Sequence, residues 1–316
     1  MKKVIQQVFA HPAIIQKPPV LVDIGASGAL PDQWKWIAAH SICIAFDADT
    51  RDFSISDSVD RDYKRLFSIN RLVANKSSTE INFYLTKSPH CSSSLHPDNK
   101  AIAPWAFRDL FEIEKIIKMP AVDLQSAIAL CGVDYIDWYK TDSQGTDLRI
   151  FNALPEEVSS RTIVAEFEPG IIDAYRGEDK LHQLMAHMDT KPFWVTNMLV
   201  KGSQRIDRED YEDLNGLQQK RLNFFLKTAP GWCEITYLNN FESANLGLRE
   251  YLLGWVFSSI KGEHGFARRL ARMGAAKFQD PLFDKLKALS LKNLSHGYLK
   301  LASLAGSRAI KMVFKK

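Results

Sequence analysis

The sequence has few cysteines and no long apolar run. Its four cysteines, Cys43, Cys91, Cys131 and Cys233, lie far apart and form no C-x-x-C pair, which favours neither a disulfide framework nor a zinc site. The most apolar stretch, residues 251–260, has about half of the ~20 residues that a transmembrane helix needs. The start of the chain lacks the continuous apolar segment of a secretory signal. We therefore predict a protein of a reducing cytoplasm that does not span a membrane.

Signatures of several common enzyme classes are also absent. No G-x-S-x-G motif occurs, so the nucleophile turn of serine hydrolases is not indicated. No G-x-G-x-x-G motif occurs either, which disfavours a site that holds a dinucleotide pyrophosphate on backbone amides. We find no internal repeat and no low-complexity tract. The composition is that of an ordinary globular chain, with 46% hydrophobic and 25% charged residues among 316.

Charge is distributed unevenly along the chain. The formal net charge is +4, but residues 241–316 hold 14 basic and 5 acidic side chains, against 27 basic and 32 acidic before them. Such an uneven distribution of charge indicates how a protein associates with partners or surfaces, and does not indicate its fold. We therefore predict a main domain over residues 1–240 and a basic helical extension over residues 241–316.

Strand and helix patterns alternate through the main domain. An apolar run at residues 20–22, which stops at Asp23-Ile24-Gly25, predicts a first strand, and residues 41–46 predict a second. Between them lie a glycine turn and a helix that starts at Pro31 and carries Trp34. Further strands are expected at residues 66–70, 80–85, 135–141, 162–167, 193–200 and 233–238, and helices at residues 2–10, 123–130, 147–153 and 179–188. The polar residues 203–220 predict a loop or surface helix. This alternation predicts an α/β fold with a mostly parallel sheet and helices on both faces.

A glycine turn follows the first predicted strand, where ligands of open α/β sheets bind. Glycine there lets the chain turn sharply and lets a ligand approach the backbone. The predicted cofactor-binding residues of this turn are Asp23, Gly25, Ala26, Ser27 and Gly28. A plain turn between two elements is the alternative, because glycines often follow strands.

Two acidic side chains follow the second predicted strand. Asp47 is placed to accept hydrogen bonds from both hydroxyls of a ribose, with Asp49 as the fallback. A solvated turn carboxylate is the alternative for either residue. Asp23 suits a ligand that carries an amino group and a positive sulfonium, because a charge-assisted hydrogen bond can reach the cation. S-adenosylmethionine is such a ligand, and we predict it as the cofactor.

The most specific pattern is D-Y-I-D-W-Y-K-T-D-S-Q-G-T-D-L at residues 134–148. With it the chain resembles the FkbM-type family of S-adenosylmethionine-dependent methyltransferases, whose block reads D-F-x-K-I-D-x-(E/Q)-G-x-E. The match runs through Lys140, Asp142, Gln144 and Gly145, with Asp147 in place of the glutamate. The resemblance covers about residues 18–200 and includes residues 22–28, 91–95, 122–124 and 164–169. It departs from the family at Phe46-Asp47-Ala48, where F-E-P is usual, and at Ala29.

The resemblance implies a class I methyltransferase fold with a seven-strand sheet, and methyl transfer to a hydroxyl of a sugar, glycan or related natural product. Asp142 is the first candidate for a general base and for a contact to cofactor or acceptor, with the N-cap of the next helix as the alternative. Glu166 and Glu168 lie two apart on one predicted strand and so share a face. We assign Glu166 to catalysis and Glu168, with Gln144, to the acceptor; a metal ion or a solvated strand end are the alternatives for the pair.

A serine-rich loop at residues 90–96 precedes this block. Functional loops often cover a site, and we predict that Ser93 and Ser94 contact the acceptor. The histidines at both ends of the loop, with Cys91 between them, do not complete a metal-binding cluster. No metal is therefore predicted.

The basic tail has two interpretations. Leucines at helical spacing with interspersed lysines over residues 281–316 predict an amphipathic helix. It either packs its leucines on the rest of the protein or lies on an anionic membrane, which would place the protein at the inner face of that membrane. No nucleic-acid partner is expected, because few aromatics accompany the basic residues. The oligomeric state stays open.

Two other functions are compatible with the same pattern. One is a non-catalytic binding protein that keeps the methyltransferase fold but not turnover. The other is an NAD-dependent oxidoreductase, because its cofactor also uses a strand, a glycine turn and an acidic residue. A cofactor titration distinguishes the second from a methyltransferase.

Overall fold

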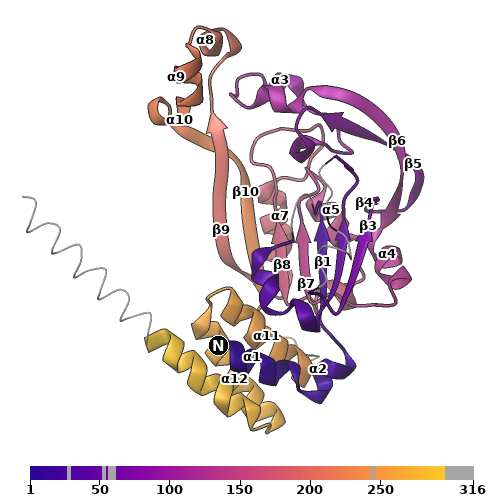
Figure 1. The fold of residues 1–316 in the computed structure, drawn as a ribbon, viewed down its shortest axis with the longest axis vertical. Helices are drawn as coiled ribbons and strands as arrows, with labels where there is room; N and C mark the ends of the chain where they lie inside the picture. Colours follow the sequence, from indigo (N-terminus) through magenta and orange to yellow (C-terminus); the bar gives the residue numbers. More distant parts are fainter. Residues whose placement is uncertain (27–29, 52–54, 56–61, 243–245, 296–316) are drawn as a thin grey trace, which may run out of the picture. The chain divides into compact units, whose positions relative to one another are not determined.

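The computed structural model describes residues 1–26, 30–51, 55, 62–242 and 246–295 (Figure 1). The chain forms two compact units. One is Pro19–Asn240, and the other combines Met1–Pro18 with Phe241–Lys316. Within the described ranges, no helix has both the length and the apolar character that a membrane span requires.

The larger unit is built on a seven-stranded sheet with the order β3-β2-β1-β7-β8-β10-β9. Its strands are β1 (Val20–Ile24), β2 (Ile42–Phe46), β3 (Arg65–Ile69), β7 (Trp138–Thr141), β8 (Val164–Phe167), β9 (Phe193–Gln204) and β10 (Thr228–Asn239). The first five in this order pair in parallel, whereas β10 is antiparallel to both of its neighbours. Every residue of β1 and β2 is buried, as their apolar runs at residues 20–22 and 42–46 predict. The expected mostly parallel α/β sheet is thus confirmed.

A second, three-stranded sheet has the order β4-β6-β5. It consists of β4 (Leu72–Ala74), β5 (Ser78–Thr86) and β6 (Ile113–Asp123), with a small core of its own. The strand predicted at residues 80–85 is therefore present as part of β5, but the separate sheet to which it belongs was not predicted. The burial of β5 agrees with a separate sheet, because most of its residues are exposed or half-buried, unlike those of a strand covered on both faces.

Three predicted helices are present as α4 (Leu124–Leu130), α5 (Asp147–Asn152) and α7 (Leu181–Met188). Their apolar side chains join those of the main sheet in one hydrophobic cluster. The helix expected from Pro31 is wrong in type, because the structure has two 3₁₀ turns, η1 (Asp32–Trp36) and η2 (Ala38–His40). A 3₁₀ turn aligns residues three apart, and this brings Trp34 and Ile37 inward together. Trp34 meets Trp138 of β7 edge to face, with ring centroids 6.0 Å apart.

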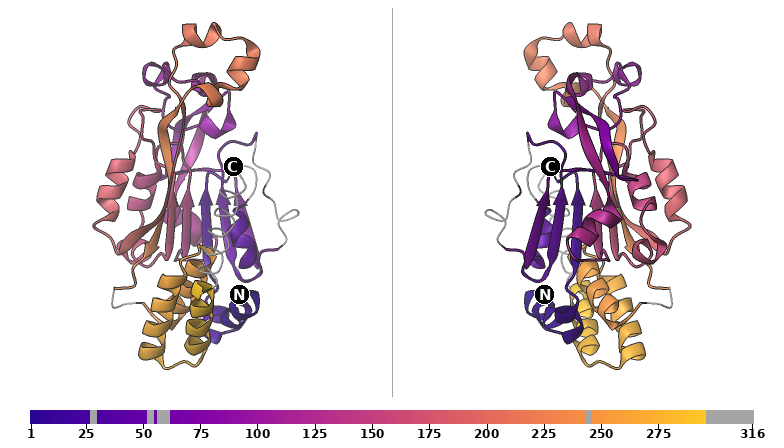
Figure 2. Two further views of the ribbon diagram at one scale, coloured as in Figure 1. Left: turned by 90° about the vertical axis from the view of Figure 1, so that its left-hand side faces the viewer. Right: turned by 90° about the vertical axis from the view of Figure 1, so that its right-hand side faces the viewer.

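Strands β9 and β10 form a long ribbon that extends beyond the sheet (Figures 1 and 2). The helices α8 (Arg208–Glu212), α9 (Gly216–Lys220) and α10 (Leu222–Phe225) connect the two strands. The polar segment at residues 203–220, predicted as a loop or a surface helix, contains α8 and α9 with non-helical residues between them. The remaining short elements are η3 (Pro89–Cys91), α3 (Asn99–Ile102), η4 (Arg108–Phe111) and α6 (Glu156–Ser159).

The smaller unit is helical. It contains α1 (Lys2–Phe9), α2 (Pro12–Gln16), α11 (Leu248–Ile260), α12 (His264–Phe278) and helical residues 282–295. Phe283 and Leu286 are fully buried. The ring of Phe283 lies against Gly274, so position 274 has no room for a side chain. The start of the predicted amphipathic segment therefore contributes to the core of this unit, and the rest of it lies outside the described residues.

Candidate functional site

The carboxyl ends of β1 and β7 approach each other closely. The chain leaves β1 toward β2 on one side and returns to β7 on the other, and ligands of open α/β sheets bind at such a reversal of strand order. Asp142, just after β7, donates its backbone N–H to the carbonyl of Ile24, 2.8 Å away. A side chain at Gly25 would lie 2.1 Å from the carbonyl oxygen of Asp142, and Gly25 has φ +80°. Only glycine fits this position.

A pocket opens at these strand ends, with about 520 Å³ of empty space that includes open solvent. We call it the switch-point pocket. Its polar side chains include Asp47, Asp49 and Asp142, and the small sheet contributes Leu72, Val73 and Phe83 to its apolar lining. The lining residues are Ile24, Gly25, Phe46, Asp47, Ala48, Asp49, Arg71, Leu72, Val73, Phe83, Pro89, His90, Ser92, Asp142, Ser143 and Gln144.

The two acidic residues after β2 differ in their surroundings. One carboxylate oxygen of Asp47 accepts the backbone N–H of Asp49 at 2.8 Å. Asp49 is buried and forms an ion pair with Arg51 at 2.6 Å. Burial alone would raise the pKa of Asp49, but hydrogen bonds from Arg51 and Ser92 outweigh this effect and lower it. Asp49 is thus already engaged by a cation, and both carboxylates line the switch-point pocket.

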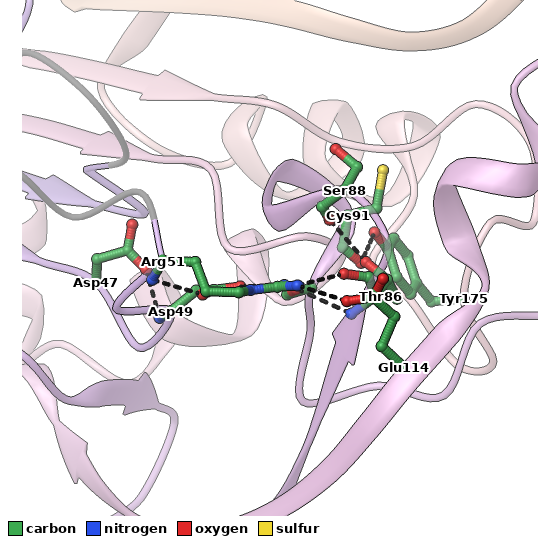
Figure 3. Close-up of polar contacts among 9 residues, drawn as sticks. Asp47, Asp49, Arg51, Thr86, Ser88, Cys91, Glu114 and Tyr175 are labelled. Atoms are coloured by element: carbon green, nitrogen blue, oxygen red, sulfur yellow. Dashed lines mark hydrogen bonds and ion pairs between the residues drawn. The ribbon is translucent and has the colours of Figure 1, made fainter.

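Arg51 connects the loop after β2 to the small sheet and to the loop at residues 88–92 (Figure 3). Its guanidinium donates to the carbonyl of Thr86 at 2.8 Å and to the hydroxyl of Ser92 at 2.9 Å, and it pairs with Glu114 at 3.1 Å. A planar guanidinium suits several directed bonds at once. Arg51 therefore positions one wall of the switch-point pocket.

The glycine turn uses its first amides internally. The backbone N–H groups of Gly25 and Ala26 both donate to the carbonyl of Phe46, each at 2.9 Å. These two amides are therefore directed at the protein and not at an anionic ligand. Ala26 is itself buried. Ser27 and Gly28, the other predicted cofactor-binding residues of this turn, lie outside the described residues.

Asp23 belongs to a polar row that crosses the sheet. Asp23 on β1 lies beside Lys140 on β7, which lies beside Glu166 on β8. Lys140 donates to Asp23 at 2.6 Å, and Glu166 accepts the indole N–H of Trp138 at 2.9 Å. Neither Asp23 nor Glu166 lines the switch-point pocket. The structure thus places these two predicted site residues in an internal network with Lys140.

A second, larger pocket adjoins the first, with about 1140 Å³ of empty space that includes open solvent. We call it the aromatic pocket. His90, Asp142 and Gln144 line both pockets, so the two meet at these side chains. The lining residues are Ser88, His90, Cys91, Phe107, Leu110, Phe111, Asp142, Gln144, Gly145, Glu168, Gly170, Ile172, Ala174, Tyr175, Glu178, Gly231 and Trp232.

Acidic side chains interact electrostatically around this junction. Burial, with the charges of Glu168 and Asp147, raises the pKa of Asp142 well above its ordinary value. Burial, with the charges of Glu234 and Asp147, also raises the pKa of Glu168. Asp142 therefore binds a proton more readily than an exposed carboxylate does, which suits a group that accepts a proton during a reaction.

Two neighbours of Asp142 shape the loop after β7. The side-chain amide of Gln144 donates to Asp142, and the backbone of Gln144 has φ 56°, a conformation that non-glycine residues rarely adopt. Asp147 accepts hydrogen bonds from Thr141 and Ser143 and from the backbone N–H of Glu168. The N-cap of α5 is Thr146, so the alternative reading of Asp142 as that cap is wrong.

The serine-rich loop contributes differently from the expectation. The hydroxyl of Ser93 donates to the carbonyl of Gln144 at 2.7 Å, and neither Ser93 nor Ser94 lines either pocket. Ser92 and His90 supply the lining instead. Across the described part of the chain, no three His, Cys, Asp or Glu side chains gather as metal ligands.

Several site residues carry no sequence signal that we recognised. Arg51 is a single basic residue in a loop, and Trp232 lies in a strand far along the chain. Tyr175, whose hydroxyl lies 2.9 Å from the carbonyl oxygen of Cys91 and from the side-chain oxygen of Gln144, follows no motif. The Pro230-Gly231 pair just before Trp232 is the one local hint of an irregular strand at the pocket.

Comparisons of the chain with protein-family models, curated proteins and solved structures give no match. The class that can be stated from the fold is therefore a coarse one. The larger unit is an α/β domain whose mostly parallel seven-stranded sheet is compatible with a Rossmann-like fold. Two pockets adjoin at the carboxyl ends of its central strands.

Proposed function

We propose that this protein is an S-adenosylmethionine-dependent methyltransferase with the class I fold. In this proposal the switch-point pocket holds the cofactor and the aromatic pocket holds the acceptor, a hydroxyl-bearing sugar, glycan or related natural product. The observation that carries the proposal is the junction of the two pockets at Asp142. A group-transfer enzyme needs two bound reactants that meet at one point.

The switch-point pocket offers chemistry that suits an adenosine bearing a cationic sulfonium. Asp47, just after β2, is placed to accept hydrogen bonds from the ribose hydroxyls. The apolar side chains of Phe46, Leu72 and Phe83 line the same pocket and provide a surface for an adenine ring. Asp142 contributes negative charge on the side where the sulfonium would lie.

The amides of the glycine turn favour this cofactor over a dinucleotide. A dinucleotide site directs backbone N–H groups at the pyrophosphate. Gly25 and Ala26 instead donate both of theirs to Phe46. Among the described residues of the turn, none therefore offers an amide to a phosphate, which argues against the NAD-dependent alternative.

The transfer step places few demands on the protein. The acceptor hydroxyl oxygen forms a bond to the methyl carbon as the bond from that carbon to sulfur breaks, and S-adenosylhomocysteine is left. Asp142 at the junction receives the hydroxyl proton, and its raised pKa favours this role. In-line alignment of oxygen, carbon and sulfur supplies much of the remaining rate.

Calorimetry with S-adenosylhomocysteine tests the cofactor assignment. We expect binding that Asp47→Ala weakens by about ten-fold, because a charge-assisted hydrogen bond contributes about 1.5 kcal/mol or more. Asp98→Ala is the matched control, since Asp98 caps α3 outside the switch-point pocket. Absence of S-adenosylhomocysteine binding, with NADH binding in its place, would reject the proposal in favour of the oxidoreductase.

Turnover separates an enzyme from a binding protein of the same fold. Asp142→Asn keeps the shape of the side chain but cannot take up a proton. We expect it to bind S-adenosylhomocysteine and to lose methyl transfer by a factor of about 10² or more. A wild-type protein that binds the cofactor and transfers no methyl group to any of a panel of hydroxylated acceptors favours the non-catalytic alternative.

A further inference from the structure

The aromatic pocket has a continuous wall of rings. Phe107 lies 6.2 Å from Trp232 and 5.4 Å from Phe111, and Phe111 lies 5.5 Å from Tyr175, as measured between ring centroids. All four side chains line the pocket. Rings in this arrangement present a broad apolar surface whose faces also attract cations. A ligand of this pocket therefore has an apolar face.

The charged lining of the same pocket is acidic. Asp142, Glu168 and Glu178 line it, and no lysine or arginine does among the residues recorded as its lining. Glu178 is compensated, because it accepts the ammonium of Lys180 at 3.0 Å and the backbone N–H of Ala174 at 2.7 Å. Asp142 and Glu168 are the other two acidic side chains of the lining.

Lys140 is a cation close to both of these carboxylates, but another carboxylate already holds it. Lys140 lowers the pKa of Asp142 and of Glu168 through its charge, but its ammonium is bonded to Asp23 at 2.6 Å. It does not line the pocket. Like charges that remain close in a shielded site repel one another. A cation in the pocket would relieve this repulsion.

The two carboxylates occupy different places. Asp142 lines both pockets, at the point where a methyl group would pass, whereas Glu168 lines the aromatic pocket alone. Glu168 and Trp232 both line the aromatic pocket, and the Trp232 side chain is close enough to lower the pKa of Glu168. Glu168 is thus an anionic group beside an aromatic face and separate from the point of transfer.

We propose that the aromatic pocket selects an acceptor that carries a positively charged amino group next to an apolar face. Glu168 pairs with the ammonium, the ring of Trp232 covers the apolar face, and Asp142 stays free for the hydroxyl that is methylated. That this ligand is the acceptor rests on the proposed methyl transfer, but the charge preference of the pocket does not. Phosphorylated or carboxylated acceptors are disfavoured, because the lining offers them no cation.

Three small phenols that differ in charge test this proposal. Tyramine is a cation, 4-ethylphenol is neutral and 3-(4-hydroxyphenyl)propionate is an anion, and all three share a ring and a hydroxyl. Binding to the full chain is measured by calorimetry and by ligand-observed NMR, with and without S-adenosylhomocysteine. We expect tyramine to bind at least about ten-fold more tightly than 4-ethylphenol, since charge-assisted bonds are the strong ones, and the propionate to bind most weakly.

Two variants locate the preference. Glu168→Gln should remove the advantage of tyramine and leave the affinity for 4-ethylphenol unchanged. Glu234→Gln is the matched control, because Glu234 lies near Glu168 but outside the pocket lining and pairs with Lys201 at 3.0 Å. It should leave the order of the three phenols as in the wild type.

The outcomes distinguish this proposal from the proposed function. Equal affinity for the three phenols, no binding of any of them, or a tyramine preference that survives Glu168→Gln overturns the charge assignment. If S-adenosylhomocysteine binds in that case, the methyltransferase proposal stands without it. If the tyramine preference holds but S-adenosylhomocysteine does not bind, the pocket assignment stands and the methyltransferase proposal fails.

Discussion

Replacing Gly25 by alanine tests the close approach of β1 and β7 on which the site depends. The new methyl group would lie 2.1 Å from the carbonyl oxygen of Asp142 and 2.9 Å from its carbonyl carbon, at a residue with φ +80°. The backbone conformation alone costs about 1–2 kcal/mol for a residue with a side chain. Moving a packed backbone carbonyl aside costs about a further 1–3 kcal/mol. We expect Gly25→Ala to lower the free energy of unfolding by about 2–5 kcal/mol.

Gly132→Ala is the matched control for this change. Gly132 follows α4 in the same unit and has φ +76°, but no atom lies within 4 Å of the side chain that would be added. The conformational cost and the stabilising loss of freedom in the unfolded chain are therefore similar in both variants. The difference between them isolates the contact with Asp142.

Denaturant unfolding gives this difference directly, and calorimetry with S-adenosylhomocysteine gives its consequence for the site. We expect Gly25→Ala to be about 1–3 kcal/mol less stable than Gly132→Ala and to bind S-adenosylhomocysteine at least about ten-fold more weakly, because Asp142 is displaced. Equal stability of the two variants would refute the argument that β7 is held against Gly25. Equal stability with wild-type cofactor affinity would also remove Gly25 from the site.

Four further changes test other parts of the structure. Arg51→Met should lower the free energy of unfolding in urea by about 1–3 kcal/mol at pH 7, because it leaves the buried Asp49 without its ion-pair partner. The pKa of Asp49 is lowered in the folded protein, so this loss of stability should shrink as the pH falls below about 4. A loss that does not change with pH contradicts the ion pair. Asp142→Asn should raise the free energy of unfolding at pH 7.5 and not at pH 4. The pKa of Asp142 is raised in the folded protein, so its ionised form destabilises the fold only at pH values above the ordinary pKa of an aspartate. A loss of stability at pH 7.5 contradicts this. Phe283→Ala should cost about 3–5 kcal/mol of the free energy of unfolding, and an unchanged free energy contradicts its place in the core. Removing residues 296–316, with their five basic and no acidic side chains, should weaken co-sedimentation with anionic vesicles about ten-fold; unchanged co-sedimentation rejects a membrane role for this segment.

The strands of the main sheet were predictable because their burial leaves a simple pattern. Strands β1 and β2 are covered on both faces, so their sequences are apolar apart from Asp23, and they are followed by a glycine or an acidic residue at the strand end. The small sheet was not predicted as a separate element. Its strand β6 alternates exposed and half-buried residues over much of its length, and alternation of this kind does not tell one sheet from another.

The residues of the candidate site also fall into those that the sequence predicts and those that it does not. Gly25, Asp47 and Asp142 follow directly from strand ends, because parallel strands bring their carboxyl ends to one edge. The position of Asp23 was predictable, but its partner was not. Its carboxylate pairs with Lys140 because the two strands are in register at these residues, and register depends on contacts that one strand alone does not encode.

The contact between Gly25 and Asp142 links the fold of the site to its proposed chemistry. The absence of a side chain at Gly25 lets β7 approach until Asp142 stands where the two pockets meet. The same approach places Asp142 near Glu168 and Asp147, whose charges raise its pKa. The close packing at Gly25 thus influences the pKa of Asp142. A buried carboxyl group with a raised pKa lowers the stability of the fold when it is ionised, and proteins tolerate such a loss mainly where function requires it. The double variant Gly25→Ala/Asp142→Asn, compared with Gly25→Ala, tests this link. If Gly25→Ala lowers the free energy of unfolding, but Asp142→Asn changes that free energy with pH in the same way as in the wild type, packing and protonation are independent and the link is wrong.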